Sequence, residues 1–377
     1  MRSPINRRFF KLYLLHNDET IKEDITNQVL LDGNLVKEYK QGQTRSLNIT
    51  LMNPTNIWNP TPISGKLWAN TKFKLQLGVE FENAIYWVDE GIFVTQDPDL
   101  TNADSNKIVS LQLFDKFALL DGTVDGKTAT EYKIPVNSSI FESIKSLLKL
   151  ERDNMGNVYD MKTIIFPSKY IDKKTPYTLS KNAMSSIGEI IIDLCNMLSC
   201  DVFYNEVGHL TIRDGVDDLD PNNRSVVWEY DKNELETLNT SMKIEWSKIR
   251  NRYLIIGANV NGMLYKGIAE NTNLQSPYNI FSEFGVKTEV ITDNLINSPD
   301  LCLERARYEL KKNAINNVSI SFSSIFLPHI NSNDLVRWSN QDYGLLNEEF
   351  IVKSVSIPLN PKEHIGISVS NIKELPL

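Results

Sequence analysis

The feature that most constrains the fold of this chain is a recurrent alternation of apolar and polar residues over short segments. Residues 350–357 read FIVKSVSI, and residues 107–114 read KIVSLQLF. Successive side chains of a β-strand point to opposite faces, so this period of two predicts antiparallel strands with one buried face. Such segments provide packing surfaces and display no reactive side chains.

One helix is predicted just before the closing strands. Ser298 is a suitable N-cap, Pro299 suits the first helical position, and Leu301 and Leu310 belong to one apolar stripe. We therefore expect a helix over residues 299–313.

The chain divides into four ranges of different character. Residues 1–120 are a run of short strands, which predicts a barrel or sandwich. Residues 121–200 form an α+β insertion with two helical patterns. Residues 201–240 hold a hairpin and an acidic linker that we expect to return to the first barrel. Residues 241–377 are again strand-rich, which permits two related barrels, so the expected class is mainly β with a peripheral helical domain.

Each helical pattern of the insertion follows a candidate cap. Ser139 or Asn137 precedes the first pattern, and Ser180 precedes the second.

The charge of the chain is concentrated in one range. The net charge is −8, and residues 201–240 hold 3 Lys/Arg against 10 Asp/Glu, which accounts for −7 of it. No basic stripe is present, so binding of nucleic acid through its phosphates is disfavoured. An acidic patch is expected in residues 201–240. Its candidate residues are Asp214, Asp217, Asp218 and Asp220.

The chain offers few groups for catalysis or for binding a metal or cofactor. The four histidines lie in four separate segments, and no nucleophile, phosphate-binding or dinucleotide-binding motif is present. The acidic residues after Asp214 lack the order of a calcium loop. Three cysteines without a framework indicate reduced thiols. No apolar run approaches the roughly 20 residues of a membrane-spanning helix. We expect no catalytic, cofactor or metal site, and no membrane-spanning segment.

Several stretches together resemble the baseplate hub proteins of phage tails and related contractile particles, mainly those of Gram-positive hosts. The stretches are TRSLNITLMNP (44–54), LFDKFALLDG (113–122), NTNLQSPYNI (271–280), SPDLCLERARYELKK (298–312), NDLVRW (333–338) and EEFIVKSVSIPLN (348–360).

This resemblance implies two barrels like those of tail-tube subunits, with three copies forming a ring of six barrels. The ring would continue a sixfold tube above and seat a threefold spike below. The acidic patch would then lie on the lumen of the ring or on its outer surface, two alternatives that remain open. The implied partners are further copies of this chain, the tail tube protein, a spike or tail lysin, the tape measure protein and other baseplate proteins, with DNA only in transit. The implied location is the virion baseplate, assembled in the host cytoplasm. Because the sequence ends at Leu377, soon after the last predicted strand, we expect any lytic activity to belong to a partner.

Two other function classes remain open. A receptor- or carbohydrate-binding β module would use an aromatic surface patch, and the chain has six tryptophans. A cell-wall hydrolase would need two converging carboxylates, which no spacing in the sequence provides.

Overall fold

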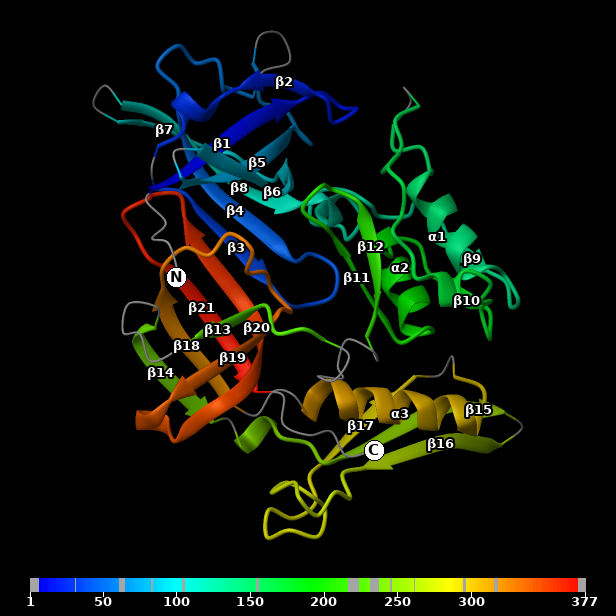
Figure 1. Cartoon of the computed structure of the whole chain (residues 1–377). Helices are drawn as coiled ribbons and strands as arrows, with labels where there is room; N and C mark the ends of the chain where they lie inside the picture. The colour runs from blue at the N-terminus through cyan, green and yellow to red at the C-terminus, as the bar shows by residue number, and fades with distance from the viewer. Residues whose placement is uncertain are drawn as a thin grey trace.

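The computed structural model describes residues 7–371 except 31, 61–64, 83, 104–105, 154–155, 216–223, 231–236, 245, 261, 294–295 and 315–317 (Figure 1). Strands account for 46% of the chain and helices for 15%. The expectation of a mainly β fold is therefore confirmed. Closure into barrels is not detected among the described strand pairings.

One 14-stranded sheet forms the body of the molecule. Its main path runs β14-β18-β21-β20-β3-β4-β8-β6-β5-β1-β2, with β7 on β8, β19 on β20 and β13 on β19. The strands are β1 (Arg7–Leu15), β2 (Ile21–Asp24), β3 (Asn34–Glu38), β4 (Arg45–Met52), β5 (Lys72–Phe81), β6 (Ala84–Thr95), β7 (Asp99–Ala103), β8 (Asn106–Asp115), β13 (Trp228–Tyr230), β14 (Leu238–Ile244), β18 (Val318–Ser324), β19 (Leu335–Asn340), β20 (Leu345–Pro358) and β21 (Ile365–Asn371).

Two halves of the sheet, far apart in sequence, meet where β3 pairs with β20. Ser354–Pro358 lie antiparallel to Asn34–Glu38, and β3 continues into β4. A single hydrophobic cluster runs through both halves, from Leu12 to Val369. The halves therefore share a core and cannot fold as separate bodies without exposing it.

A buried ion pair lies at this junction. The Lys37 ammonium on β3 is 2.9 Å from Glu90 Oε2 on β6, and both side chains are 1% exposed. It also donates to the Ile330 carbonyl at 3.2 Å and to Asn331 Oδ1 at 2.8 Å, both just before β19. All three ammonium protons thus have acceptors, from both halves of the sheet.

A β-bulge turns Glu90 inward. Leu75 pairs with Gly91 and Gln76 pairs with Asp89, so Glu90 is an extra residue without a partner on β5. Gly91 has φ +145°, and a Cβ there would lie 3.0 Å from the Phe93 ring. Only glycine fits this turn readily.

Residues 116–215 form a peripheral α+β unit on one side of the sheet (Figure 1). It contains α1 (Ile140–Leu148), α2 (Ile187–Asn196) and two short sheets, β9 (Tyr132–Ile134) with β10 (Leu179–Lys181) and β11 (Cys200–Tyr204) with β12 (Leu210–Asp214). Ser139 caps α1, as one of the two alternatives predicted. Ser186, not Ser180, caps α2, because Ser180 belongs to β10.

Buried charges attach this unit to the sheet. Glu19, after β1, lies 2.7 Å from Lys116, 2.9 Å from Lys72 and 2.9 Å from Lys162. Lys116 is fully buried and also pairs with Asp160 at 2.8 Å. Burial alone would raise the pKa of Glu19, but Lys116 and Lys72 outweigh it and lower that pKa to about 2.

Residues 246–314 form a second small unit. The strands β15 (Arg252–Val260), β16 (Met263–Glu270) and β17 (Thr288–Thr292) make a separate sheet, covered on one face by α3 (Pro299–Ala314). Ser298 accepts from Leu301 N at 3.2 Å, so its predicted capping role is confirmed. At Gly267 a Cβ would lie 2.2 Å from the α3 backbone, which explains this glycine.

This grouping differs from the ranges drawn from the sequence. The prediction assigned residues 241–377 to one barrel, whereas β15–β17 and α3 form their own sheet and core. The prediction also assigned residues 201–240 to the first barrel. In the structure the hairpin β11–β12 packs in the peripheral unit. The strands β13 and β14 join the second half of the large sheet. Alternation identifies strands but not their partners, which depend on long-range register.

We expect Lys37→Met to lower the free energy of unfolding by about 3–5 kcal/mol, because Glu90 would keep a buried charge without a counter-ion. Lys37→Met/Glu90→Leu should recover most of this loss. Urea unfolding followed by tryptophan fluorescence measures both. Equal losses in the single and double variants would show that the pair does not act as a unit.

We expect Glu19→Gln to lower the free energy of unfolding by up to about 3 kcal/mol at pH 7, because the folded protein holds the pKa of Glu19 at about 2, well below its ordinary value. The folded pKa is depressed, so the wild-type advantage is full above about pH 4.5 and disappears as the pH falls toward 2. Urea unfolding at several pH values tests this. Glu142→Gln, at an exposed helical pair, is the control and should change little at any pH. A Glu19→Gln deficit that does not depend on pH would contradict the assignment.

Candidate functional surface

The exposed side of the large sheet carries an almost uncharged polar surface, here called the polar face. Its positions are set by strand register: rows of directly opposed residues cross β14, β18, β21, β20, β3, β4 and β8. One row is Ser241–Ser321–Ser368–Ser354–Glu38, a second is Ser323–Gly366–Ser356–Val36–Ser46–Phe114, and a third is Pro358–Asn34–Asn48–Gln112.

The polar face follows directly from the alternation in the sequence. Residues between these positions, such as Leu47, Ile320 and Ile367, are buried in the shared core, so their neighbours must point the other way. Asn48, Gln112 and Ser321 are exposed. The sequence therefore predicts which side is buried, but the joining of seven strands into one surface depends on the β3–β20 pairing.

Hydroxyl and amide groups dominate the polar face. Ser356 Oγ donates to Asn34 Oδ1 at 3.1 Å, and Ser321 and Ser368 lie 3.5 Å apart at their hydroxyls. Along the three rows the described residues include one charged side chain, Glu38, which pairs with Lys40 at 2.6 Å. Beside them on the same side, the opposed pair Lys243–Ser319 places one lysine on the edge strand β14. Such a surface offers neutral hydrogen bonds and no cation along these rows with which a phosphate could pair.

One end of the polar face is acidic. Asp32, Asp97 and Asp99 line a shallow hollow of about 470 Å³ together with Asn48 and other polar-face residues of β4 and β8. Thr50 donates to Asp32 at 2.9 Å. Sequence reasoning missed these aspartates because Asp32 and the Asp97–Asp99 pair lie in two separate segments that only the sheet brings together.

The acidic residues that the sequence singled out lie elsewhere. Asp214 ends β12, is 8% exposed, accepts from the Tyr170 hydroxyl at 2.8 Å and pairs with Lys169. Burial, followed by the Asp214 carboxylate, raises the pKa of Tyr170. The contacts of Asp214 with Tyr170 and Lys169 thus lie within the peripheral unit. Asp217, Asp218 and Asp220 lie outside the described residues, so the acidic patch stays a prediction.

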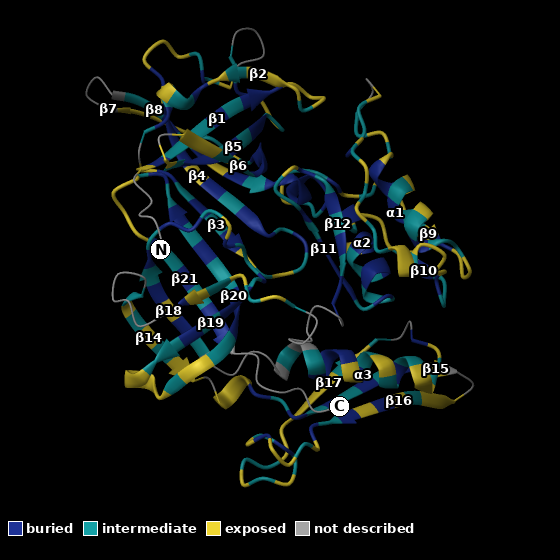
Figure 2. Ribbon diagram, in the orientation of Figure 1, coloured by how far each residue is buried: buried dark blue, intermediate teal, exposed yellow. Residues whose placement is uncertain are grey.

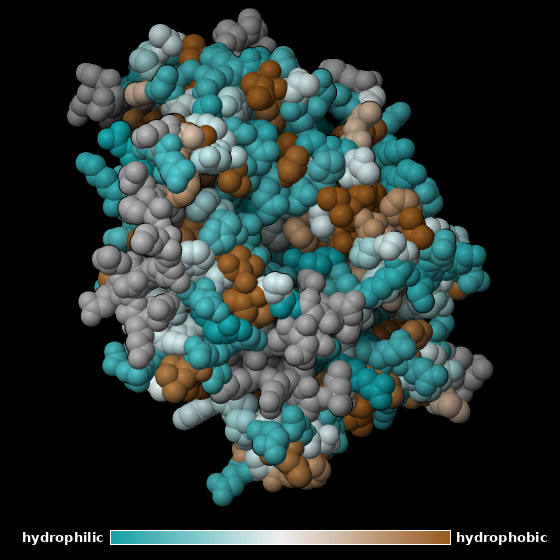
Figure 3. Space-filling view, in the orientation of Figure 1, coloured by the Kyte–Doolittle hydropathy of each residue, from teal (hydrophilic) through white to brown (hydrophobic). Residues whose placement is uncertain are grey.

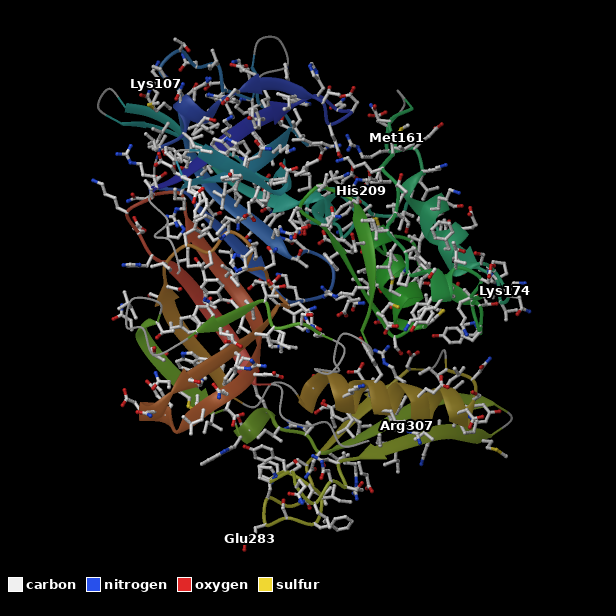
Figure 4. All side chains as sticks on the ribbon, viewed as in Figure 1. Lys107, Met161, Lys174, His209, Glu283 and Arg307 are labelled. Atoms are coloured by element: carbon white, nitrogen blue, oxygen red, sulfur yellow. The ribbon has the colours of Figure 1, made fainter. Side chains whose placement is uncertain are left out.

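Groups that could bind a metal, a sugar or a membrane are scattered. Within the described ranges no three His, Cys, Asp or Glu side chains gather as a metal site, and no helix is long and apolar enough to cross a membrane. His209 lies in the peripheral unit, as Figure 4 shows, and its Nδ1 is 2.8 Å from the Thr163 carbonyl. Trp68 and Trp246 are well exposed but belong to different parts of the chain. Figure 3 shows apolar residues dispersed among polar ones on the visible surface.

Solved structures provide the decisive comparison. The 43 kDa tail protein of prophage MuSo2 from Shewanella oneidensis superposes with a TM-score of 0.61 at 12% identity, covering 97% of this chain and 98% of that one. The chain has the fold of a tail protein.

Two further tail proteins share this fold. A tail protein from Neisseria meningitidis MC58 has a TM-score of 0.61 at 6% identity, covering 96% of this chain and 97% of that one. The prophage tail protein gp18 from Listeria monocytogenes EGD-e has a TM-score of 0.58 at 12% identity, covering 97% and 95%. No family model and no curated protein matches the sequence. The similarity therefore lies in the arrangement of the chain rather than in its residues.

Proposed function

We propose that this chain is the structural hub of a tail baseplate, with three copies closing into a ring whose channel is lined by the polar face. The observation that carries the proposal is the row of mostly neutral polar side chains across seven strands of a fold shared with tail proteins over nearly its whole length. In this assembly each half of the sheet belongs to one tube-like barrel. The hub works by geometry, without catalysis.

The size of the sheet supports a ring of three. The channel-lining strands of one copy are β7, β8, β4, β3, β20, β21, β18 and β14. Three copies supply 3 × 8 = 24 strands, and at about 4.8 Å per strand the backbone circumference is roughly 115 Å and the diameter roughly 37 Å. Strand tilt widens such a barrel further. After side chains are allowed for, the channel admits a DNA duplex.

Ring closure also removes the outer edges of this wall. In the described part of the chain, β14 pairs only with β18 and β7 pairs only with β8, so both present a free edge. Pairing β7 of one copy with β14 of the next is a heterologous contact that closes after three steps. Six barrels then face a sixfold tube protein on one side and a threefold spike or tail lysin on the other, with the tape measure protein or DNA passing through.

The composition of the channel matches passage of a polyanion. A protein that neutralises phosphates with Lys or Arg releases counter-ions and binds DNA tightly at low salt. The polar face has no such cations along its rows, and the Asp32, Asp97 and Asp99 hollow adds repulsion. DNA therefore slides along it without being held.

Mass in solution tests the ring directly. We expect light scattering on the purified chain, alone and with the spike protein from the same tail, to give three copies of the 43.1 kDa chain. Quantitative mass spectrometry of whole particles should give three copies per tail. A single copy per tail, or a number that is not a multiple of three, contradicts the hub proposal.

Lysines placed in the channel test the role of the polar face. We expect Asn48→Lys/Gln112→Lys/Ser321→Lys to leave folding intact, because all three side chains are exposed, but to slow DNA release from purified particles at low salt. High salt should restore the rate. The control has three lysines at exposed positions of the peripheral unit, Met161, Ile171 and Met184. Equal release by both variants would exclude the polar face from the channel.

A further inference from the structure

The first half of β6 has a free strand edge that the proposed ring does not use. Phe93–Thr95 pair with β8, but Ala84–Asp89 pair only with β5 among the described residues. The backbone of Ile85–Asp89 makes no other hydrogen bond to the described part of the chain. One row of N–H and C=O groups therefore faces outward over about six residues.

The bulge at Glu90 and Gly91 causes this opening. It bends β6 away from β8, and β7 then pairs with Asn106–Ser110, along the edge of β8 that β6 has left. Since Lys37 holds Glu90 in the core, the bend is a fixed part of the fold.

The side chains along this edge are apolar and aromatic, although most of them are exposed. Ile85 is 42% exposed, Tyr86 60% and Val88 37%, and Lys11 lies 4.3 Å from the centroid of the Trp87 ring. β-branched and aromatic residues favour strands. Proline and lysine are two residues that commonly prevent a solvent-exposed strand edge from pairing with another chain. The segment AIYWVD contains neither of them.

We propose that Ala84–Asp89 is a strand-addition site that binds an extended segment of a different tail polypeptide. Only a strand satisfies the free backbone groups along this edge, and Tyr86 and Val88 select apolar residues at alternate positions. The single charged side chain of the edge, Asp89, already pairs with Lys74 at 2.9 Å and accepts from Gln76 at 2.7 Å, so the bound segment needs no opposing charge there.

A second copy of β6 is a poor occupant. Two identical strand edges pair antiparallel about a twofold axis, and such a contact is self-complementary. It would join rings in pairs and would not build a threefold ring. The occupant is therefore a segment of another protein, and the inference rests on the proposed function only in naming that protein as a tail component.

The hairpin geometry predicts which amides change on binding. Phe81 and Ala84 flank the two-residue turn and form a hydrogen-bonded pair, after which bonded and non-bonded pairs alternate. Tyr86 and Val88 thus bond to β5, whereas the N–H groups of Ile85, Trp87 and Asp89 point to the free side. Hydrogen exchange of single amides distinguishes the two sets.

The experiment compares the isolated chain with purified tails. In the isolated chain we expect rapid exchange at Ile85, Trp87 and Asp89 and slow exchange at Tyr86 and Val88. In the tail all five should exchange slowly, with at least a tenfold decrease at the first three. If the alternation persists in the tail, the strand-addition site is wrong while the hub stands. If the chain is absent from tails, the hub proposal itself fails.

A variant identifies the occupant. Ile85→Lys adds a charge to the free edge without touching the shared core, and we expect it to fold and form the ring but to lose one specific protein from the tail. Met184→Lys, at an exposed position of the peripheral unit, should lose none. Retention of every tail protein by Ile85→Lys, or pairing of the isolated chain into twofold dimers that the substitution abolishes, overturns the proposal.

Discussion

The structure depends on one buried cation. Lys37 stands on β3, the strand through which the two halves of the sheet are joined, and its ammonium reaches Glu90 in one half and the Ile330–Asn331 turn in the other. A buried charge is tolerated only when every proton finds an acceptor. The three acceptors come from segments about 50 and 290 residues away, so the cation specifies the register of β3, the β6 bulge and the approach to β19 together.

The same alternation in sequence serves two purposes on the two sides of the sheet. Leucine, isoleucine and valine at alternate positions build one continuous core, and Figure 2 shows buried positions alternating with more exposed ones along the strands. A surface made by register cannot move relative to the core behind it. If the polar face lines a channel, as proposed, the wall of that channel is as rigid as the fold.

Much of the local structure could be predicted from the sequence, because it depends on neighbouring residues. The strand at 350–357 and the helix from Pro299, with Ser298 as its cap, are examples. The long-range partners of a residue could not be predicted. Serine is a common helix cap, but Ser180 pairs within β10. Lysine is usually exposed, but Lys37 is buried. In both cases the deciding contacts come from distant segments, for which short-range patterns carry no information.

In the proposed hub, the peripheral unit and the unit containing α3 have different surfaces. The peripheral unit is attached through the Glu19–Lys116–Asp160 network, whose charges are committed to one another and leave little net attraction for other molecules. The unit containing α3 is different: residues 246–290 supply 8 of the 26 well-exposed large apolar side chains of the described chain, including Leu274 and Phe281 in the loop whose tip, at Glu283, projects in Figure 4. That loop is stiffened by buried asparagines, among them Asn251, which donates to two of its carbonyls. The polar face and the surface of the unit containing α3 thus differ in the side chains that they expose. In the proposed ring, register and neutrality would define the channel, whereas exposed apolar groups on rigid supports are typical of surfaces that contact other proteins.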